Sequence, residues 1–92
     1  MSAYVVVEAT VRNQEARDRY GSQANVVLKQ FGAEVLTFGP WQLLCGNAGH
    51  DIGMIIRFQD RDTALAWYSS PAYQALLDVR DDALDCRFRL VG

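Results

Sequence analysis

Residues 60–83 read DRDTALAWYSSPAYQALLDVRDDA, and they predict two helical pieces joined at a Ser-Ser-Pro bend. Asp60 can cap the first piece, because its carboxylate accepts hydrogen bonds from the unpaired amides of the first turn. Ser70 can cap the second piece, with Pro71 at the first helical position, where its missing N–H costs nothing. The second piece carries Arg80 on an apolar stripe at helical spacing. That stripe comprises Tyr73, Leu76, Leu77, Arg80, Ala83 and Leu84.

The remaining chain predicts one long helix and four strands. Asn13 can cap a helix over residues 14–31, which has an apolar residue every three or four positions and ends at Gly32. Alternation of apolar residues predicts strands over residues 4–11, 34–38, 53–59 and 85–91.

The connection after the second of these strands is rich in turn-forming residues. We expect Gly39-Pro40 to break or bend the strand, residues 41–45 to continue it or form a short separate strand, and residues 46–51 to form a turn. The order βαββαβ predicts an α+β, ferredoxin-like fold, with a four-stranded antiparallel sheet and both helices on one face.

Length and charge restrict the class of protein. The 92 residues predict a single domain over residues 1–92, whose small core would gain stability from a partner subunit. A net charge of −2 argues against nucleic-acid binding, which needs a basic surface. No apolar run is long enough to span a membrane, and the chain enters its first strand with no basic leader, so we expect a cytoplasmic protein.

The metal-binding and nucleophilic residue types are few and scattered. Cys45, Cys86 and His50 show no ligand spacing, so we expect no metal site. We interpret the cysteines as small, half-buried apolar residues, with a disulfide as the alternative. No phosphate-binding glycine loop is present and no histidine lies on an expected helix, so no cofactor is expected.

The sheet face away from the helices mixes apolar and charged residues. Tyr4, Val6 and Ile55 alternate there with Glu8, Thr10 and three arginines, namely Arg57, Arg87 and Arg89. Counting from the strand centres places Glu8 near Arg57 on one side and near Arg87 on the other. This cluster is either a set of cross-strand pairs on a solvated face or a polar cluster enclosed when two sheets stack.

Four residues of the 60–83 stretch are candidate ligand contacts. Arg80 would pair with Glu8 or a backbone carbonyl in a structural role, or bind a carboxylate or enolate in a functional one. Trp67, Tyr68 and Tyr73 either pack in the core or line a pocket. Glu8 and Arg57 complete the set of candidate ligand-binding residues.

His50 is a weak acid–base candidate. It is the one side chain that titrates near neutrality unaided, but its glycine-rich turn favours an exposed position without a role. Glu8 is a poor general base, because two nearby arginines would lower its pKa. Glu8 is therefore better interpreted as a residue that positions the arginines.

The chain resembles the family known as domain of unknown function 1330, within the dimeric α+β barrel superfamily. The resemblance rests on Ala3-Tyr4-Val5, Phe31-Gly32, Phe58-Gln59-Asp60 and above all on residues 66–74, AWYSSPAYQ, followed by Arg80. It covers essentially the whole chain. In that family the residue after the proline is often Glu, and here it is Ala72.

The resemblance implies a homodimer with facing sheets and a pocket in each subunit. Relatives in the superfamily include cofactor-independent monooxygenases, isomerases and cyclases, but the family supplies no reaction. Two hypotheses therefore stay open. One is a cofactor-free enzyme acting on an aromatic or polyketide-like anion, and the other is a non-catalytic dimer that binds a metabolite or a partner protein.

Overall fold

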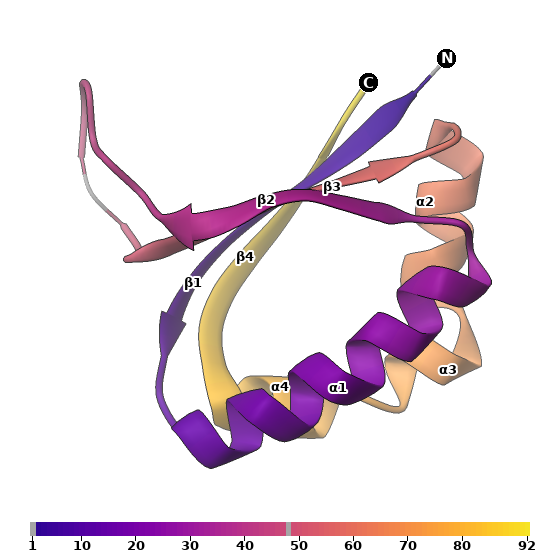
Figure 1. The fold of residues 1–92 in the computed structure, drawn as a ribbon, viewed down its shortest axis with the longest axis horizontal. Helices are drawn as coiled ribbons and strands as arrows, with labels where there is room; N and C mark the ends of the chain where they lie inside the picture. Colours follow the sequence, from indigo (N-terminus) through magenta and orange to yellow (C-terminus); the bar gives the residue numbers. More distant parts are fainter. Residues whose placement is uncertain (1, 48) are drawn as a thin grey trace.

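The structure is a computed structural model that describes residues 2–47 and 49–92 (Figure 1). The elements follow the order β1 (Ala3–Val11), α1 (Gln14–Gln30), β2 (Glu34–Pro40), β3 (Ile52–Phe58), α2 (Arg61–Ser69), α3 (Pro71–Gln74), α4 (Leu77–Ala83) and β4 (Leu84–Val91). The strands form one antiparallel sheet in the order β2-β3-β1-β4, and the helices cover one of its faces (Figure 1). The predicted ferredoxin-like fold is confirmed.

The core lies between the sheet and the helices. The inward side chains of β1 alternate with outward ones, as a strand with one covered face requires. The largest fully buried side chains are Trp67, Tyr73 and Phe58, so the 60–83 stretch supplies two of the three. No helix in the described residues is both long enough and apolar enough to cross a membrane.

The predicted helix caps are confirmed. Asn13 accepts a hydrogen bond from the Ala16 amide at 3.0 Å. Ser70 accepts one from the Tyr73 amide at 3.1 Å, with Pro71 at the start of α3. Gly32, with φ of 65°, follows the end of α1 in the left-handed region that glycine tolerates.

Asp60 caps α2 with two hydrogen bonds, from the amide and the hydroxyl of Thr63, both at 2.7 Å. These bonds favour the carboxylate and lower the pKa of Asp60. The contribution of this cap to the stability of the folded protein is therefore complete above the ordinary aspartate pKa of about 3.9. It is lost as the pH falls through the lowered pKa of Asp60.

We expect Asp60→Asn to be less stable than the unmodified protein at pH 7 and to approach it in stability as the pH falls through the lowered pKa of Asp60, because the carboxylate is protonated in both states only below that value. Urea unfolding at pH 7 and pH 2, at one protein concentration, measures the difference. An equal difference at both pH values would contradict the assignment.

The connection between β2 and β3 differs from expectation. Strand β2 continues through Pro40, which the sheet tolerates because β2 lies at its edge. Residues 41–45 are not a strand, because β3 begins at Ile52 opposite Pro40 and offers them no partner. The predicted turn at 46–51 includes Ala48, which lies outside the described residues.

The second helical piece is also divided. Helix α3 ends at Gln74 and α4 begins at Leu77, where one continuous helix was expected. The break at Ala75 and Leu76 changes the direction of the chain (Figure 1). Arg80 consequently lies on a separate short helix and faces Tyr68 of α2.

Candidate functional site

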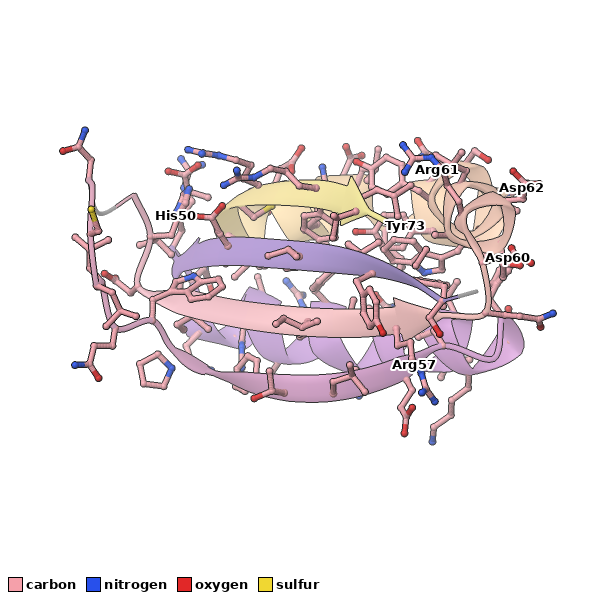
Figure 2. The ribbon with its side chains drawn as sticks, turned by 90° about the horizontal axis from the view of Figure 1, so that it is seen from above. His50, Arg57, Asp60, Arg61, Asp62 and Tyr73 are labelled. Carbon is pink, nitrogen blue, oxygen red and sulfur yellow. The ribbon has the colours of Figure 1, made fainter. Side chains whose placement is uncertain are left out.

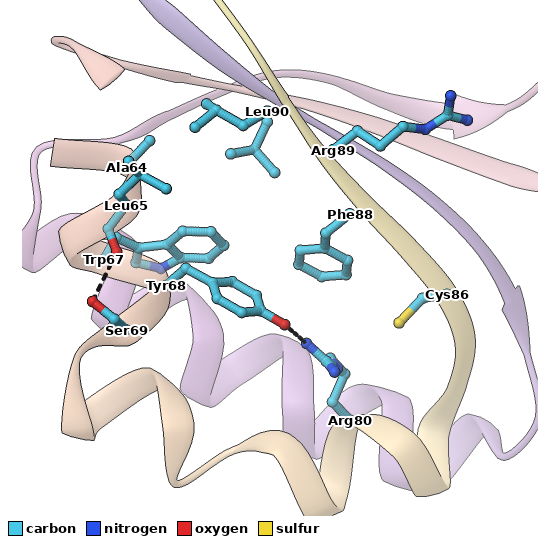
Figure 3. Close-up of a pocket in the computed structure, with 11 residues that line it drawn as sticks. Ala64, Leu65, Trp67, Tyr68, Ser69, Arg80, Cys86, Phe88, Arg89 and Leu90 are labelled. Carbon is cyan, nitrogen blue, oxygen red and sulfur yellow. Dashed lines mark hydrogen bonds between the residues drawn. The ribbon is translucent and has the colours of Figure 1, made fainter. Parts of the chain in front are cut away.

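A cavity of about 540 Å³ opens between β4 and helices α2 and α4 (Figure 3). Its walls are mainly apolar and aromatic. Helix α2 contributes Leu65, Trp67 and Tyr68, and β4 contributes Cys86, Phe88 and Leu90. Arg80 of α4 reaches into this wall opposite Tyr68, and a second charged residue, Arg89 of β4, also lines the cavity (Figure 3).

The guanidinium of Arg80 is held by two tyrosines. Its Nη1 donates to the Tyr68 hydroxyl at 3.0 Å and to the Tyr73 hydroxyl at 3.3 Å. Its carbon lies 5.2 Å from the centre of the Phe88 ring, a cation–π distance. The Arg80 side chain is only 12% exposed, so it is a largely enclosed cation with a defined orientation.

The expected structural partners of Arg80 were wrong. Neither Glu8 nor a backbone carbonyl pairs with it in the described part of the chain. Its Nε instead donates to Asp81 at 3.2 Å, at the solvent edge. Burial opposes the charge of Arg80, but the tyrosine hydrogen bonds outweigh burial and raise its pKa, so it stays cationic at physiological pH.

A buried pair of tyrosine hydroxyls, those of Tyr20 and Tyr73, supports Arg80. The hydroxyls of Tyr20 and Tyr73 lie 2.7 Å apart and join α1 to α3. Burial raises the pKa of both tyrosines, that of Tyr20 well above its ordinary value, so both hydroxyls stay protonated at neutral pH. The chain of contacts from Tyr20 through Tyr73 to Arg80 therefore fixes the guanidinium by side chains of three helices.

Two hydrogen-bond donors remain available at the cavity. Nη2 of Arg80 has no hydrogen-bond partner among residues 2–47 and 49–92. The Tyr68 oxygen accepts from Arg80, so its own hydrogen is left to donate, and no described residue accepts it. A cation and a hydroxyl donor in an apolar wall are suited to a carboxylate or enolate oxygen.

The cavity wall provides no base that titrates near neutrality. Its described lining contains no carboxylate and no imidazole. Burial raises the pKa of the Cys86 thiol, and the Arg80 charge offsets only part of this rise. The arrangement can therefore bind and stabilise an anion, but it is not built to abstract a proton.

Trp67 forms the floor of the cavity. Its indole is 1% exposed and lies nearly parallel to the Phe88 ring, at an interplanar angle of 13° with ring centres 6.4 Å apart. Its Nε1 has no acceptor among the described residues. Trp67 and Tyr73 are thus both core residues and parts of the site, whereas Tyr68 is an exposed residue of the cavity wall.

The structure separates Glu8 and Arg57 from this cavity. Glu8 lies opposite Gly53 on β3, not opposite Arg57 as expected, because the register pairs Ala3 with Phe58. It does lie opposite Arg87, but its ion pair is with Arg89. Arg57 forms an ion pair with Glu34 on β2, and both pairs lie on the outer face of the sheet.

His50 lies apart from Arg57, and it does not line the cavity beside Arg80. Its Nδ1 is 3.1 Å from the Thr10 hydroxyl, near the end of β1. Figure 2 shows His50 and Arg57 toward opposite ends of the sheet. The candidate residues are therefore divided, with Trp67, Tyr68, Tyr73 and Arg80 together and Glu8, Arg57 and His50 elsewhere.

Sequence reasoning missed three residues of the site. Tyr20 lies on the predicted stripe of the first helix, and its hydroxyl, which needs a partner when buried, was the available signal. Phe88 and Cys86 lie on the predicted inward row of the last strand, where no sequence signal separates a cavity wall from core. Both cysteines are free thiols, Cys86 half-buried as expected and Cys45 exposed.

Within the described residues, no three histidine, cysteine or acidic side chains lie close enough together to hold a metal ion. The order of the elements and the four-stranded antiparallel sheet with its helices on one face define an α+β protein of the ferredoxin-like fold. The chain matches the family described as domain of unknown function (DUF1330) over residues 2–92, and it belongs to that family.

Solved structures share this fold at low sequence identity. A protein of unknown function from Rhodopseudomonas palustris is similar with a TM-score of 0.80 and 19% identity, covering 98% of this chain and 80% of that one. SnoaB, a cofactor-independent oxygenase from Streptomyces nogalater, is similar with a TM-score of 0.71 and 9% identity, covering 99% and 91%.

A third similar structure is a dimeric protein of unknown function with a ferredoxin-like fold from Bacteroides fragilis. Its TM-score is 0.64 at 7% identity, covering 99% of this chain and 95% of that one. No curated protein matches the chain. At these identities the structural similarities establish the fold of the chain.

Proposed function

We propose that the chain binds a small anionic organic molecule, aromatic or polyketide-like, in the cavity beside Arg80. The observation that carries this proposal is the enclosed guanidinium, held by Tyr68 and Tyr73 in a wall that is apolar apart from Ser69 and Arg89. The donors suit a carboxylate or enolate, and the aromatic floor suits a flat ring. An apolar pocket with few converging polar groups is the usual form of a small-molecule site.

Arg80→Met tests this binding site. We expect the affinity for an aromatic acid such as 2-naphthoate to fall about 10- to 100-fold, because a charge-assisted hydrogen bond contributes about 1.5–3 kcal/mol. Isothermal titration calorimetry measures the affinity, and circular dichroism confirms that the variant is folded.

Arg19→Met is the matched control, because it removes the same charge from an exposed position of α1. We expect it to bind 2-naphthoate as the unmodified protein does. A folded Arg80→Met variant with unchanged affinity would remove Arg80 from the site and with it the proposed function.

The same donors favour a catalytic role of the cofactor-free kind, as a monooxygenase, isomerase or cyclase. Arg80 and Tyr68 would stabilise an oxyanion, and a substrate acidic enough to ionise beside Arg80 would need no protein base. SnoaB, which is similar in fold, is a cofactor-independent oxygenase. The alternative is that the chain is a binding protein without catalytic activity. Formation of a product from any bound enol or phenol, in the presence of air, would exclude that alternative.

We further propose that two copies pair through the outer faces of their sheets. Tyr4, Val6 and Ile55 provide apolar area on this face. Four of the charges on this face are already paired, Glu8 with Arg89 and Glu34 with Arg57, which reduces the cost of enclosing those four. The similar protein from Bacteroides fragilis is described as dimeric.

A further inference from the structure

The connection between β2 and β3 carries an exposed run of apolar residues. Trp41, Leu43 and Leu44 are all exposed, Leu44 over 91% of its surface, and Cys45 is an exposed free thiol. Residues 35–49 contain no Asp, Glu, Lys or Arg, although such residues make up 22% of the chain, so this segment lacks the charges that usually keep a surface loop solvated. Consecutive exposed apolar residues are unfavourable in water and are typical of an interaction site.

The base of this connection is fixed to the outer face of the sheet. A Cβ atom placed on Gly53, which faces outward from β3, would overlap the Trp41 ring, so the indole lies directly on this glycine. The Trp41 amide donates to the Asp51 carbonyl at 3.0 Å. At the other end of the connection, Nδ1 of His50 lies 3.1 Å from the Thr10 hydroxyl. Both ends of the connection are therefore held on the sheet.

The middle of the connection projects beyond the sheet, and we call residues 41–47 the arm. In Figure 1 the arm rises from one end of the sheet, on the side away from the helices. The arm has no strand partner among the described residues of its own subunit, because β3 begins at Ile52 opposite Pro40. Leu43 and Leu44 are therefore exposed on the side of the sheet that is proposed to face a second copy.

The flat part of the outer face is small for a stable dimer. Its four strands have seven to nine residues each. At about 4.8 Å between strands and about 3.3 Å per residue, they cover roughly 500 Å². Stable interfaces usually bury about 800 Å² on each partner. The pair therefore needs further contact area, and the arm is apolar and continuous with this face through Trp41.

We propose that the arm is a dimerisation element, and that in the pair formed by the outer sheet faces the arm of each subunit packs Leu43 and Leu44 against the partner subunit. The partner that this surface fits is a second copy of the chain. This inference rests on the proposed pairing of the outer faces, and it names the element that completes that interface. A two-fold pair contains two arms, so each substitution in the arm acts twice.

A variant that combines Leu43→Ser with Leu44→Ser tests the arm. We expect its dimer dissociation constant to rise at least about 100-fold, because both arms lose apolar area that the dimer encloses. Sedimentation velocity measures the dissociation constant. Val26→Ser is the matched control, because it shortens an exposed apolar side chain of α1, and it should dimerise as the unmodified protein does.

The double variant should fold normally, because both leucines are exposed in the single subunit. Urea unfolding at a concentration where both proteins are monomeric checks this, and we expect equal stability of the variant and the unmodified protein.

Cys45 reports on the arm in the unmodified protein. We expect N-ethylmaleimide to modify Cys45 at least about fivefold more slowly in the dimer than in the monomer, because packing of the arm restricts access to the thiol. Mass spectrometry of protein labelled well above and well below the dissociation constant measures the two rates. Cys86 is the internal control, because it lies on the inner side of β4, and its rate should not depend on concentration.

The failure of this inference and the failure of the dimer are distinguishable. If the unmodified protein dimerises but the double variant dimerises equally well, or if Cys45 reacts equally fast in monomer and dimer, the arm lies outside the interface. The proposed dimer would then stand, and the arm would fit a partner other than this chain. If the unmodified protein stays monomeric at high concentration, the proposed dimer fails and this inference fails with it.

Discussion

Trp67→Ala is expected to lower the free energy of unfolding by about 3–5 kcal/mol, the usual effect of removing a buried aromatic side chain. Trp67 is among the largest fully buried side chains of the protein, and it packs on Phe58 and Tyr73 with ring centres 5.1 and 4.6 Å away. Its removal would also enlarge the cavity beside Arg80, because Trp67 lines that cavity. For a domain of this size the melting temperature should fall by about 15–30 °C.

Urea and thermal unfolding at one protein concentration measure this loss. Trp67→Phe is the matched control, because it keeps a ring and because the indole Nε1 has no acceptor to lose among the described residues. We expect it to lose less than half as much stability as the alanine variant. Equal losses in the two variants would mean that the ring itself does not support the core.

Ile55→Asp is expected to weaken the proposed dimer at least about 100-fold. Ile55 lies opposite Val6 in the middle of the outer sheet face. A new carboxylate there would be enclosed between two sheets without a partner, at a cost on the order of 3 kcal/mol or more. The monomer should fold normally, because the same carboxylate would be in contact with water.

Sedimentation velocity over a range of concentrations measures the dissociation constant. Val26→Asp is the control, because Val26 is 57% exposed on α1, in the helix layer on the other side of the sheet. It should dimerise as the unmodified protein does. An unmodified protein that stays monomeric at high concentration would contradict the dimer, and the outer face would then be solvated.

The sequence correctly predicted the features that depend only on residues close together in the chain. Asp60, Ser70 and Asn13 cap helices as predicted, because a cap depends on hydrogen bonds between neighbours in the chain. The alternation of apolar residues also placed each strand within about two residues. Residues 41–45 were the exception, because a strand needs a partner and β3 begins too late to provide one.

The sequence did not predict the neighbours of Glu8 on the outer face of the sheet correctly. Counting from strand centres placed Glu8 opposite Arg57, but the true partner is Gly53, four positions away. An even shift keeps every side chain on its own face, so the face was predicted correctly and the neighbour was not. The ion pair of Glu8 is with Arg89, diagonal to it across the strands and not directly opposite.

By itself the sequence determined the order of the elements, their caps, the inner and outer faces of the sheet, and the presence of an arginine on an apolar stripe. These depend on periodicity and on contacts between near neighbours. Only the tertiary structure decided that Arg80 is held by Tyr68 and Tyr73, that Tyr20 supports them, and that a cavity lined by Trp67 and Phe88 opens beside Arg80. Those features join residues from α1, α2, α3, α4 and β4, and their distances depend on how the helices pack on the sheet, which no local pattern specifies.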